Sequence, residues 1–163
     1  EANPEVPKVL VELFEEKPFV AANAIGWTHN SFLGDAKAEK IMFQQLEHGW
    51  DKQCGGIFYF MDIKGHPPQQ LEHDQKLWWV HLETLVALAK TYAYNKNPKA
   101  EAWFKKVHEY TWIHFKDREN GGEWYGYLNR QGEVHLNLKG GKWKGCFHVP
   151  RALLEVWKTL EKV

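Results

Sequence analysis

Residues 145–151, with the sequence GCFHVPR, contain the strongest candidate for acid–base chemistry in this chain. Pro150 suits the first turn of a helix, so His148 is expected at or just before a helix N-terminus. The positive end of the helix dipole disfavours an imidazolium there, and a neutral imidazole can accept a proton from carbon. Arg151 could stabilise the oxyanion that develops. A histidine that only caps backbone N–H groups is an equally good interpretation of these residues.

Residues 76–83, with the sequence KLWWVHLE, form a second group that could do chemistry. On a helix, Trp79 and Glu83 are four residues apart and share one face, while Trp78 and Leu82 share a more apolar neighbouring face. An aromatic wall beside a carboxylate could bind the hydroxyl groups of a sugar. The alternative is that Glu83 is solvated and both tryptophans only pack in the core.

The composition excludes several classes of function. The 21 basic residues balance 21 acidic ones, so the chain has no broad attraction for nucleic acid or for an anionic membrane. No apolar run is long enough to span a bilayer. Histidine and cysteine spacings match no metal site, and no glycine pattern indicates a nucleotide cofactor. Tryptophan, tyrosine and phenylalanine make up 15% of the residues, which suits either an aromatic core or a carbohydrate site.

The two cysteines are expected to be reduced thiols in a cytoplasmic protein, because the N-terminal residues do not resemble a signal peptide. Cys146 is expected to be a small buried thiol close to His148.

The elements that must position these side chains are mainly helices, expected over residues 7–16, 37–46, 74–94, 98–115 and 149–161. Asp35 is expected to cap the second of these helices. Residues 57–61 predict a short strand, and residues 124–128 and 133–136 predict a hairpin around a turn at 129–132. The last helix is expected to bury an apolar stripe: Leu153, Leu154, Trp157 and Leu160. The pattern predicts a single all-α domain with short strands in its loops.

Several Trp-rich segments in the same order resemble the N-acylglucosamine 2-epimerase family, which includes the renin-binding proteins. The resemblance runs from about residue 49 to the C-terminus. The segments that carry it are GGIFYF at 55–60, QLE at 70–72, KLWWVHLE at 76–83, EWYGYL at 123–128 and KGGKWKGCFHVPR at 139–151.

This resemblance implies part of an (α/α)6 barrel and the interconversion of N-acetylglucosamine and N-acetylmannosamine through loss and return of the C2 proton. Two histidines act from opposite faces of the sugar, and His148 matches one of them. Arg151 and Glu83 match substrate-binding residues, Trp79 and His81 match neighbouring positions, and Cys146 matches a cysteine of the animal-type members. The resemblance implies no required cofactor, ATP or another nucleotide as a possible effector, and a homodimer.

The chain departs from the family pattern in two respects. Members are considerably longer, and the second histidine normally lies in a His-x-x-Glu motif upstream of the segment here at 49–51. That motif does not occur in this sequence, and His29 and His48, which lie nearby, are not in the pattern. We therefore expect that the chain is a fragment, that it exposes a wide apolar surface, and that alone it does not epimerise.

Other functions fit the same residues. An aldose–ketose isomerase or a disaccharide 2-epimerase would share the histidine chemistry in a differently shaped pocket. A non-enzymatic binding protein would need no second histidine. A glycosidase of similar fold would need two opposed carboxylates, and Glu83 is the one carboxylate that the sequence pattern places at a candidate site.

Overall fold

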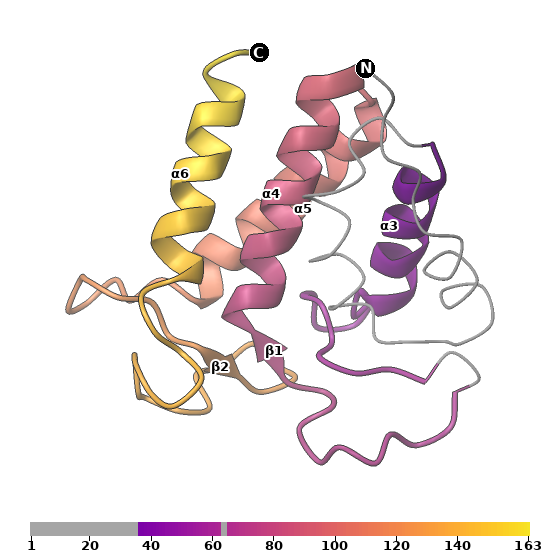
Figure 1. Cartoon of the computed structure of the whole chain (residues 1–163). Coiled ribbons are helices and arrows are strands. Elements are labelled where there is room, and N and C mark those ends of the chain that lie inside the picture. The colour runs from indigo at the N-terminus through magenta and orange to yellow at the C-terminus, as the bar shows by residue number, and fades with distance from the viewer. Residues whose placement is uncertain (1–35, 63–64) are drawn as a thin grey trace.

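The computed structural model describes residues 36–62 and 65–163 and consists mainly of helices (Figure 1). The expected helix at 7–16 and the expected cap Asp35 lie outside these residues. The four described helices and two strands are, in chain order, α3 (Ala36–Gly49), β1 (Lys76–Leu77), α4 (Trp78–Asn95), α5 (Pro98–His114), β2 (Tyr127–Leu128) and α6 (His148–Leu160). Four of the five helices expected from the sequence are therefore present, with shifted ends.

Helix α4 lies at the centre of the described core. It packs against both α5 and α6, and Figure 1 shows α6 and α3 on opposite sides of it. Its sequence is apolar around most of its circumference, which is typical of a helix that is covered on several sides. The helix ends at Lys96, which adopts a left-handed conformation with φ of 56° and donates its backbone N–H to the carbonyl of Tyr92.

Helix α5 follows from local signals in the sequence. Asn97 caps it by accepting a hydrogen bond from the backbone N–H of Lys99, and Pro98 occupies the first turn, where a missing N–H costs no hydrogen bond. Val107, Thr111 and Phe115 are fully buried, and their spacing of four residues places them along one side of the helix.

The strands differ from the expected ones. Residues 57–61 form no strand, and only Ile57 makes an isolated bridge, to Trp50. The turn at 129–132 is present, and the backbone N–H of Asn129 donates to the carbonyl of Glu133. However, β2 forms its ladder with β1, in the antiparallel pairs Lys76–Leu128 and Leu77–Tyr127, and meets the 133–136 segment only at one bridge.

A buried ion network explains why residues 76–77 are extended although a helix was expected from residue 74. The side chain of Lys76 is fully buried, and its Nζ lies 3.0 Å from Oδ2 of Asp51, which Arg130 also contacts at 3.3 Å. Burial lowers the pKa of Lys76 to about 8, although Asp51 opposes this shift. An extended β1 lets Lys76 reach this carboxylate, so α4 begins only at Trp78.

The apolar stripe of α6 is not buried as expected. Leu153, Leu154, Trp157 and Leu160 are 37–61% exposed, while Val149 and Ala152 on another side of the helix face the core. One side of α6 packs on α4, and Leu153, Trp157 and Leu160 line an open groove of about 250 Å³ together with residues of α4 and α5. This agrees with the expectation of a wide exposed apolar surface.

Gly126 provides a test of how the loops pack on the start of α4. A Cβ at Gly126 would lie 2.6 Å from Cδ of Lys144, whose buried ammonium pairs with Glu123 at 2.9 Å. Because Lys144 is held at its far end and cannot easily move aside, we expect Gly126→Ala to destabilise the fold by about 1–3 kcal/mol in urea unfolding. Gly141→Ala is the matched control, since nothing lies within 4 Å of its Cβ. Equal stability of the two variants would contradict this packing.

Candidate active site

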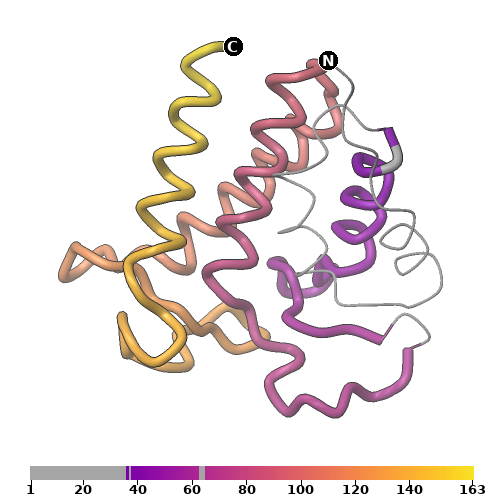
Figure 2. The backbone as a smooth tube through the Cα atoms, viewed as in Figure 1, coloured from indigo at the N-terminus to yellow at the C-terminus, as the bar shows by residue number. Residues whose placement is uncertain are grey.

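A pocket of about 540 Å³ lies where the loops meet the first turns of α4 and α6. Figure 2 shows the long connections before α4 and before α6 gathered at this end of the helices. The volume falls within the range of small-molecule sites. Aromatic rings dominate the lining, which consists of Tyr59, Glu72, Gln75, Leu77, Trp78, Trp79, Tyr127, Trp143 and His148.

Glu83, His148 and Arg151 form a connected group beside this pocket. Nδ1 of His148 lies 2.8 Å from Oε1 of Glu83. Nη1 of Arg151 donates to both carboxylate oxygens of Glu83, at 2.7 and 2.8 Å. The Glu83 side chain is 6% exposed, so its charge is largely removed from water and compensated by the guanidinium. The three side chains meet because α4, which carries Glu83, packs against α6, which carries His148 and Arg151.

The carboxylate assigns the tautomer of His148. A carboxylate paired with a guanidinium accepts hydrogen bonds, so the proton of the neutral imidazole lies on Nδ1. Nε2 then carries a lone pair, and no described residue donates a hydrogen bond to it. Since His148 lines the pocket, this nitrogen is suited to remove a proton from a bound molecule.

The structure supports the sequence-based position of His148 and adds a second reason for its chemistry. His148 is the first residue of α6, as the position of Pro150 predicted. The helix N-terminus was expected to keep the imidazole neutral, but the direct partner of the ring is Glu83, which lies 65 residues earlier. The link between the two motifs could not be derived from either motif alone.

Of the other predicted site residues, some line the pocket and some lie outside its lining. Trp79 lines the pocket, with its ring centre 6.0 Å from that of His148, and Trp78 lines it as well, although Trp78 was expected only to pack. Arg151 contacts Glu83 and is not part of the pocket lining. Cys146 is exposed, so the expectation of a buried thiol is wrong, because the loop before α6 runs along the surface. Neither cysteine forms a disulfide.

His81 lies in the core and not in the pocket lining. Its side chain is fully buried, Nδ1–H donates to the carbonyl of Leu77 at 2.7 Å, and Nε2 accepts from the backbone N–H of Ile57 at 3.0 Å. Both ring nitrogens are therefore used within the protein. His81 joins the first turn of α4 to the loop that contains Gly56 and Ile57.

The buried imidazole of His81 predicts a loss of stability in acid. Burial, as the main cause, lowers the pKa of His81 from about 6.5 to about 3. Below pH 6.5 the imidazole of His81 binds a proton in the unfolded chain but not in the folded chain, so the free energy of unfolding falls until the pH approaches 3. We expect a loss of about 2 kcal/mol from His81 between pH 6.5 and pH 5, measured by urea unfolding. His81→Gln should flatten this slope, and an unchanged slope in the variant would contradict the assignment.

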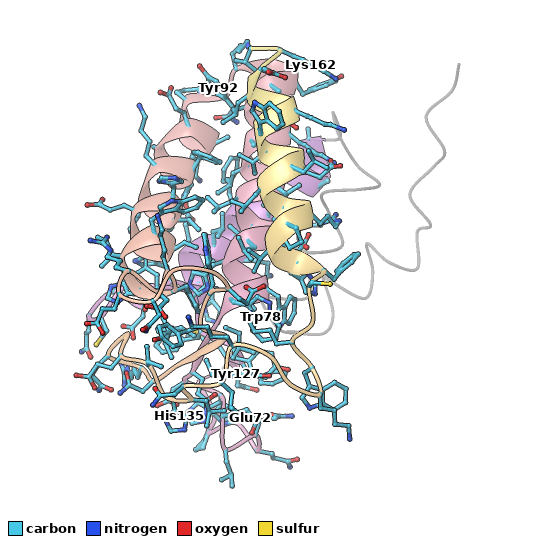
Figure 3. The ribbon with its side chains drawn as sticks, turned by 90° about the vertical axis from the view of Figure 1, so that its left-hand side faces the viewer. Glu72, Trp78, Tyr92, Tyr127, His135 and Lys162 are labelled. Atoms are coloured by element: carbon cyan, nitrogen blue, oxygen red, sulfur yellow. The ribbon has the colours of Figure 1, made fainter. Side chains whose placement is uncertain are left out.

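Several pocket residues were missed by the sequence analysis. Tyr59, Gln75, Tyr127 and Trp143 were not named as site residues, although all except Gln75 belong to the high aromatic content that indicated a carbohydrate site. They come from loops and from β2, whose pairing was not expected. Figure 3 shows Trp78, Tyr127 and Glu72 at one end of the molecule, away from Tyr92 and Lys162 at the other.

Other kinds of site are not evident in the described part of the chain. In residues 36–62 and 65–163, no group of three or more histidine, cysteine or acidic side chains could hold a metal ion. Within the same ranges, no helix is long and apolar enough to cross a membrane. His48 is exposed in the last turn of α3 and is not part of the pocket lining, and His29 lies outside the described residues.

Comparison with known proteins identifies a family and a fold. A sequence model of the family described as N-acylglucosamine 2-epimerase (GlcNAc 2-epimerase) matches residues 25–152. The N-acylglucosamine 2-epimerase of Mus musculus is 48% identical over 115 residues, which cover 71% of this chain and 27% of the mouse protein. The D-mannose isomerase of Marinomonas mediterranea is 30% identical over 128 residues, which cover 76% of this chain and 30% of that protein.

Solved structures agree with the expected fold. A crystal structure of a D-mannose isomerase matches 86% of this chain and 37% of its own chain, with a TM-score of 0.74 and 24% identity. The expected fold class is confirmed: the described residues form part of an (α/α)6 barrel with a small two-stranded sheet in the loops. The chain spans less than a third of the length of the curated relatives described above.

Proposed function

We infer a function from the fact that this chain belongs to the N-acylglucosamine 2-epimerase family. We propose that the whole protein is an isomerase that interconverts N-acetyl-D-glucosamine and N-acetyl-D-mannosamine, with His148 as one of its acid–base groups. The observation that carries the proposal is the contact between His148 and Glu83 at the edge of an aromatic pocket. The 48% identity to the mouse epimerase supports the choice of substrate.

The proposed reaction begins with the open-chain sugar in the pocket. Nε2 of His148 takes the proton from C2, and the electron pair of the broken C–H bond moves toward C1 to give an enolate. The negative charge accumulates on the oxygen at C1. Glu83 stabilises the imidazolium that forms, because its carboxylate holds the Nδ1–H on the other side of the ring.

Epimerisation then requires a proton to return to C2 from the opposite face of the enolate. The family resemblance implies a second histidine for this step. Among the described residues, His148 is the one histidine in the pocket lining, so the second group is assigned to none of them. Arg151 is proposed to hold the Glu83 carboxylate in place and thereby to orient His148. Trp79 is proposed to contact the sugar.

A second candidate function is the interconversion of an aldose and a ketose. The 30% identity to a D-mannose isomerase favours this alternative, since the same first proton transfer at C2 would serve it. The two functions differ in where the proton returns: to C2 in an epimerase and to C1 in an aldose–ketose isomerase. Product analysis therefore separates them.

The function is tested by incubating the whole protein with N-acetylmannosamine and, separately, with mannose, and identifying the products by NMR. We expect N-acetylglucosamine from the first sugar and no ketose from the second. Fructose from mannose, with no reaction of N-acetylmannosamine, would establish the second candidate instead. No product from either sugar would overturn both.

The cellular setting is also a proposal. The free thiols of Cys54 and Cys146 fit a reducing compartment, and we propose a cytoplasmic protein. A homodimer, and ATP or another nucleotide as an effector without a required cofactor, are proposed from the family resemblance alone.

A further inference from the structure

Glu72 is the acidic residue in the lining of the pocket that contains His148. The other acidic group nearby, Glu83, is paired with Arg151 behind His148. Figure 3 shows Glu72 and Tyr127 at the same end of the molecule, and both residues line the pocket. Glu72 therefore brings a negative charge to a cavity whose walls are mainly aromatic.

The turn that carries Glu72 is fixed to the pocket wall. The backbone N–H of Gln75 donates to the carbonyl of Glu72 at 3.1 Å, which closes the turn. The backbone N–H groups of Tyr59 and Phe60 donate to the carbonyls of Gln75 and His73, both at 3.0 Å. Although Glu72 is exposed, its backbone position at the pocket is set by these hydrogen bonds.

The charge of Glu72 has no neutralising partner among the residues that the structure describes. No described lysine, arginine or histidine forms an ion pair with it. The pKa of Tyr59 is raised by burial first and by the charge of Glu72 second, which indicates that the field of the carboxylate acts on the pocket wall. Two lysines lie over rings of the lining: Nζ of Lys142 is 5.0 Å from the ring centre of Trp143, and Nζ of Lys144 is 5.8 Å from that of Trp78. Neither lysine is part of the lining itself.

We propose that Glu72 makes the pocket selective for uncharged sugars and disfavours their phosphorylated forms. The inference rests on the proposed function, because it concerns the substrate of that same site. A carboxylate accepts hydrogen bonds from the hydroxyl or amide N–H groups of a neutral sugar. A phosphate monoester carries about −1.5 to −2 charges at neutral pH, so the same carboxylate repels it. This selectivity distinguishes neutral from phosphorylated sugars by their charge, and it does not depend on which face of the sugar His148 contacts.

The test compares binding of N-acetylmannosamine and N-acetylmannosamine 6-phosphate to the whole protein by isothermal titration calorimetry. We expect the wild type to bind the neutral sugar more tightly. Glu72→Gln should reduce the ratio of the two dissociation constants about fivefold, because one partly screened charge is removed. Raising the salt concentration should reduce the ratio in the wild type and have less effect in the variant. A purely structural role of Glu72 would not produce this salt dependence.

Asp74→Asn is the matched control. It removes a charge of the same sign from the same turn, at a residue that does not line the pocket, and should leave the ratio nearly unchanged. An unchanged ratio in Glu72→Gln, or equal effects of both variants, would overturn the inference while leaving the proposed function intact. If the wild type binds neither sugar, the proposed function fails, and the inference fails with it.

Discussion

Replacing His148 with asparagine is expected to slow the interconversion of N-acetylmannosamine and N-acetylglucosamine by at least about 10²–10⁴-fold, the usual contribution of a general base. Asparagine retains a polar group that can contact Glu83, but its amide cannot accept the C2 proton at neutral pH. The loss should appear in kcat, measured by NMR on the whole protein, with a much smaller change in KM.

His135→Asn is the control for this variant. His135 is exposed, and its described hydrogen bond to Tyr127 uses the backbone N–H, so the imidazole is not needed for it. We expect wild-type turnover from this control. Turnover of His148→Asn within tenfold of the wild type would contradict a catalytic role for His148.

Replacing Glu83 with glutamine should impair both catalysis and stability. The amide no longer neutralises Arg151, and it does not favour the Nδ1–H tautomer of His148 as a carboxylate does. We expect kcat to fall by on the order of 10²-fold or more, as when the carboxylate behind a catalytic histidine is made neutral. We also expect a loss of about 3 kcal/mol in urea unfolding, because a largely buried ion pair is broken on one side.

Glu155→Gln provides the comparison for stability. Glu155 pairs with Lys90 at 2.9 Å and also joins α6 to α4, but its side chain is 39% exposed. Such a partly exposed pair contributes less than about 1 kcal/mol, so this variant should be nearly as stable as the wild type and fully active. If both variants lost the same stability, burial of Glu83 would not be the reason for its effect.

The sequence predicted the elements whose signals are local. Helix α5 follows from the cap at Asn97, the proline after it and the spacing of Val107 and Thr111. The start of α6 at His148 follows from Pro150. These features depend on residues a few positions apart, and the printed sequence contains them directly.

Features that depend on distant partners could not be predicted in this way. The pairing of β1 with β2 joins residues about 50 positions apart, and the burial of Lys76 depends on Asp51. His81 matched a site position by resemblance, but the backbone of Ile57 and Leu77 holds it in the core. The stripe of α6 was expected to be buried because its apolar residues have helical spacing. Such spacing does not show whether another element covers that side of the helix.

The candidate site was predicted in part. Glu83, His148 and Trp79 were all named, and the structure brings them together at one pocket. Tyr59 and Trp143, which help to complete the wall, come from loops, and Tyr127 comes from the two-residue strand β2. No periodic pattern in these segments marks which side chain turns inward.

The central claim is that His148, held by Glu83, removes the proton at C2 of an open-chain sugar. The most direct measurement is NMR of the product after N-acetylmannosamine reacts with the whole protein in deuterium oxide. We expect N-acetylglucosamine with deuterium at C2 from the wild type, and no deuterium incorporation within the same period from His148→Asn. N-acetylglucosamine that retains its original hydrogen at C2, or equal labelling by wild type and variant, would contradict the account.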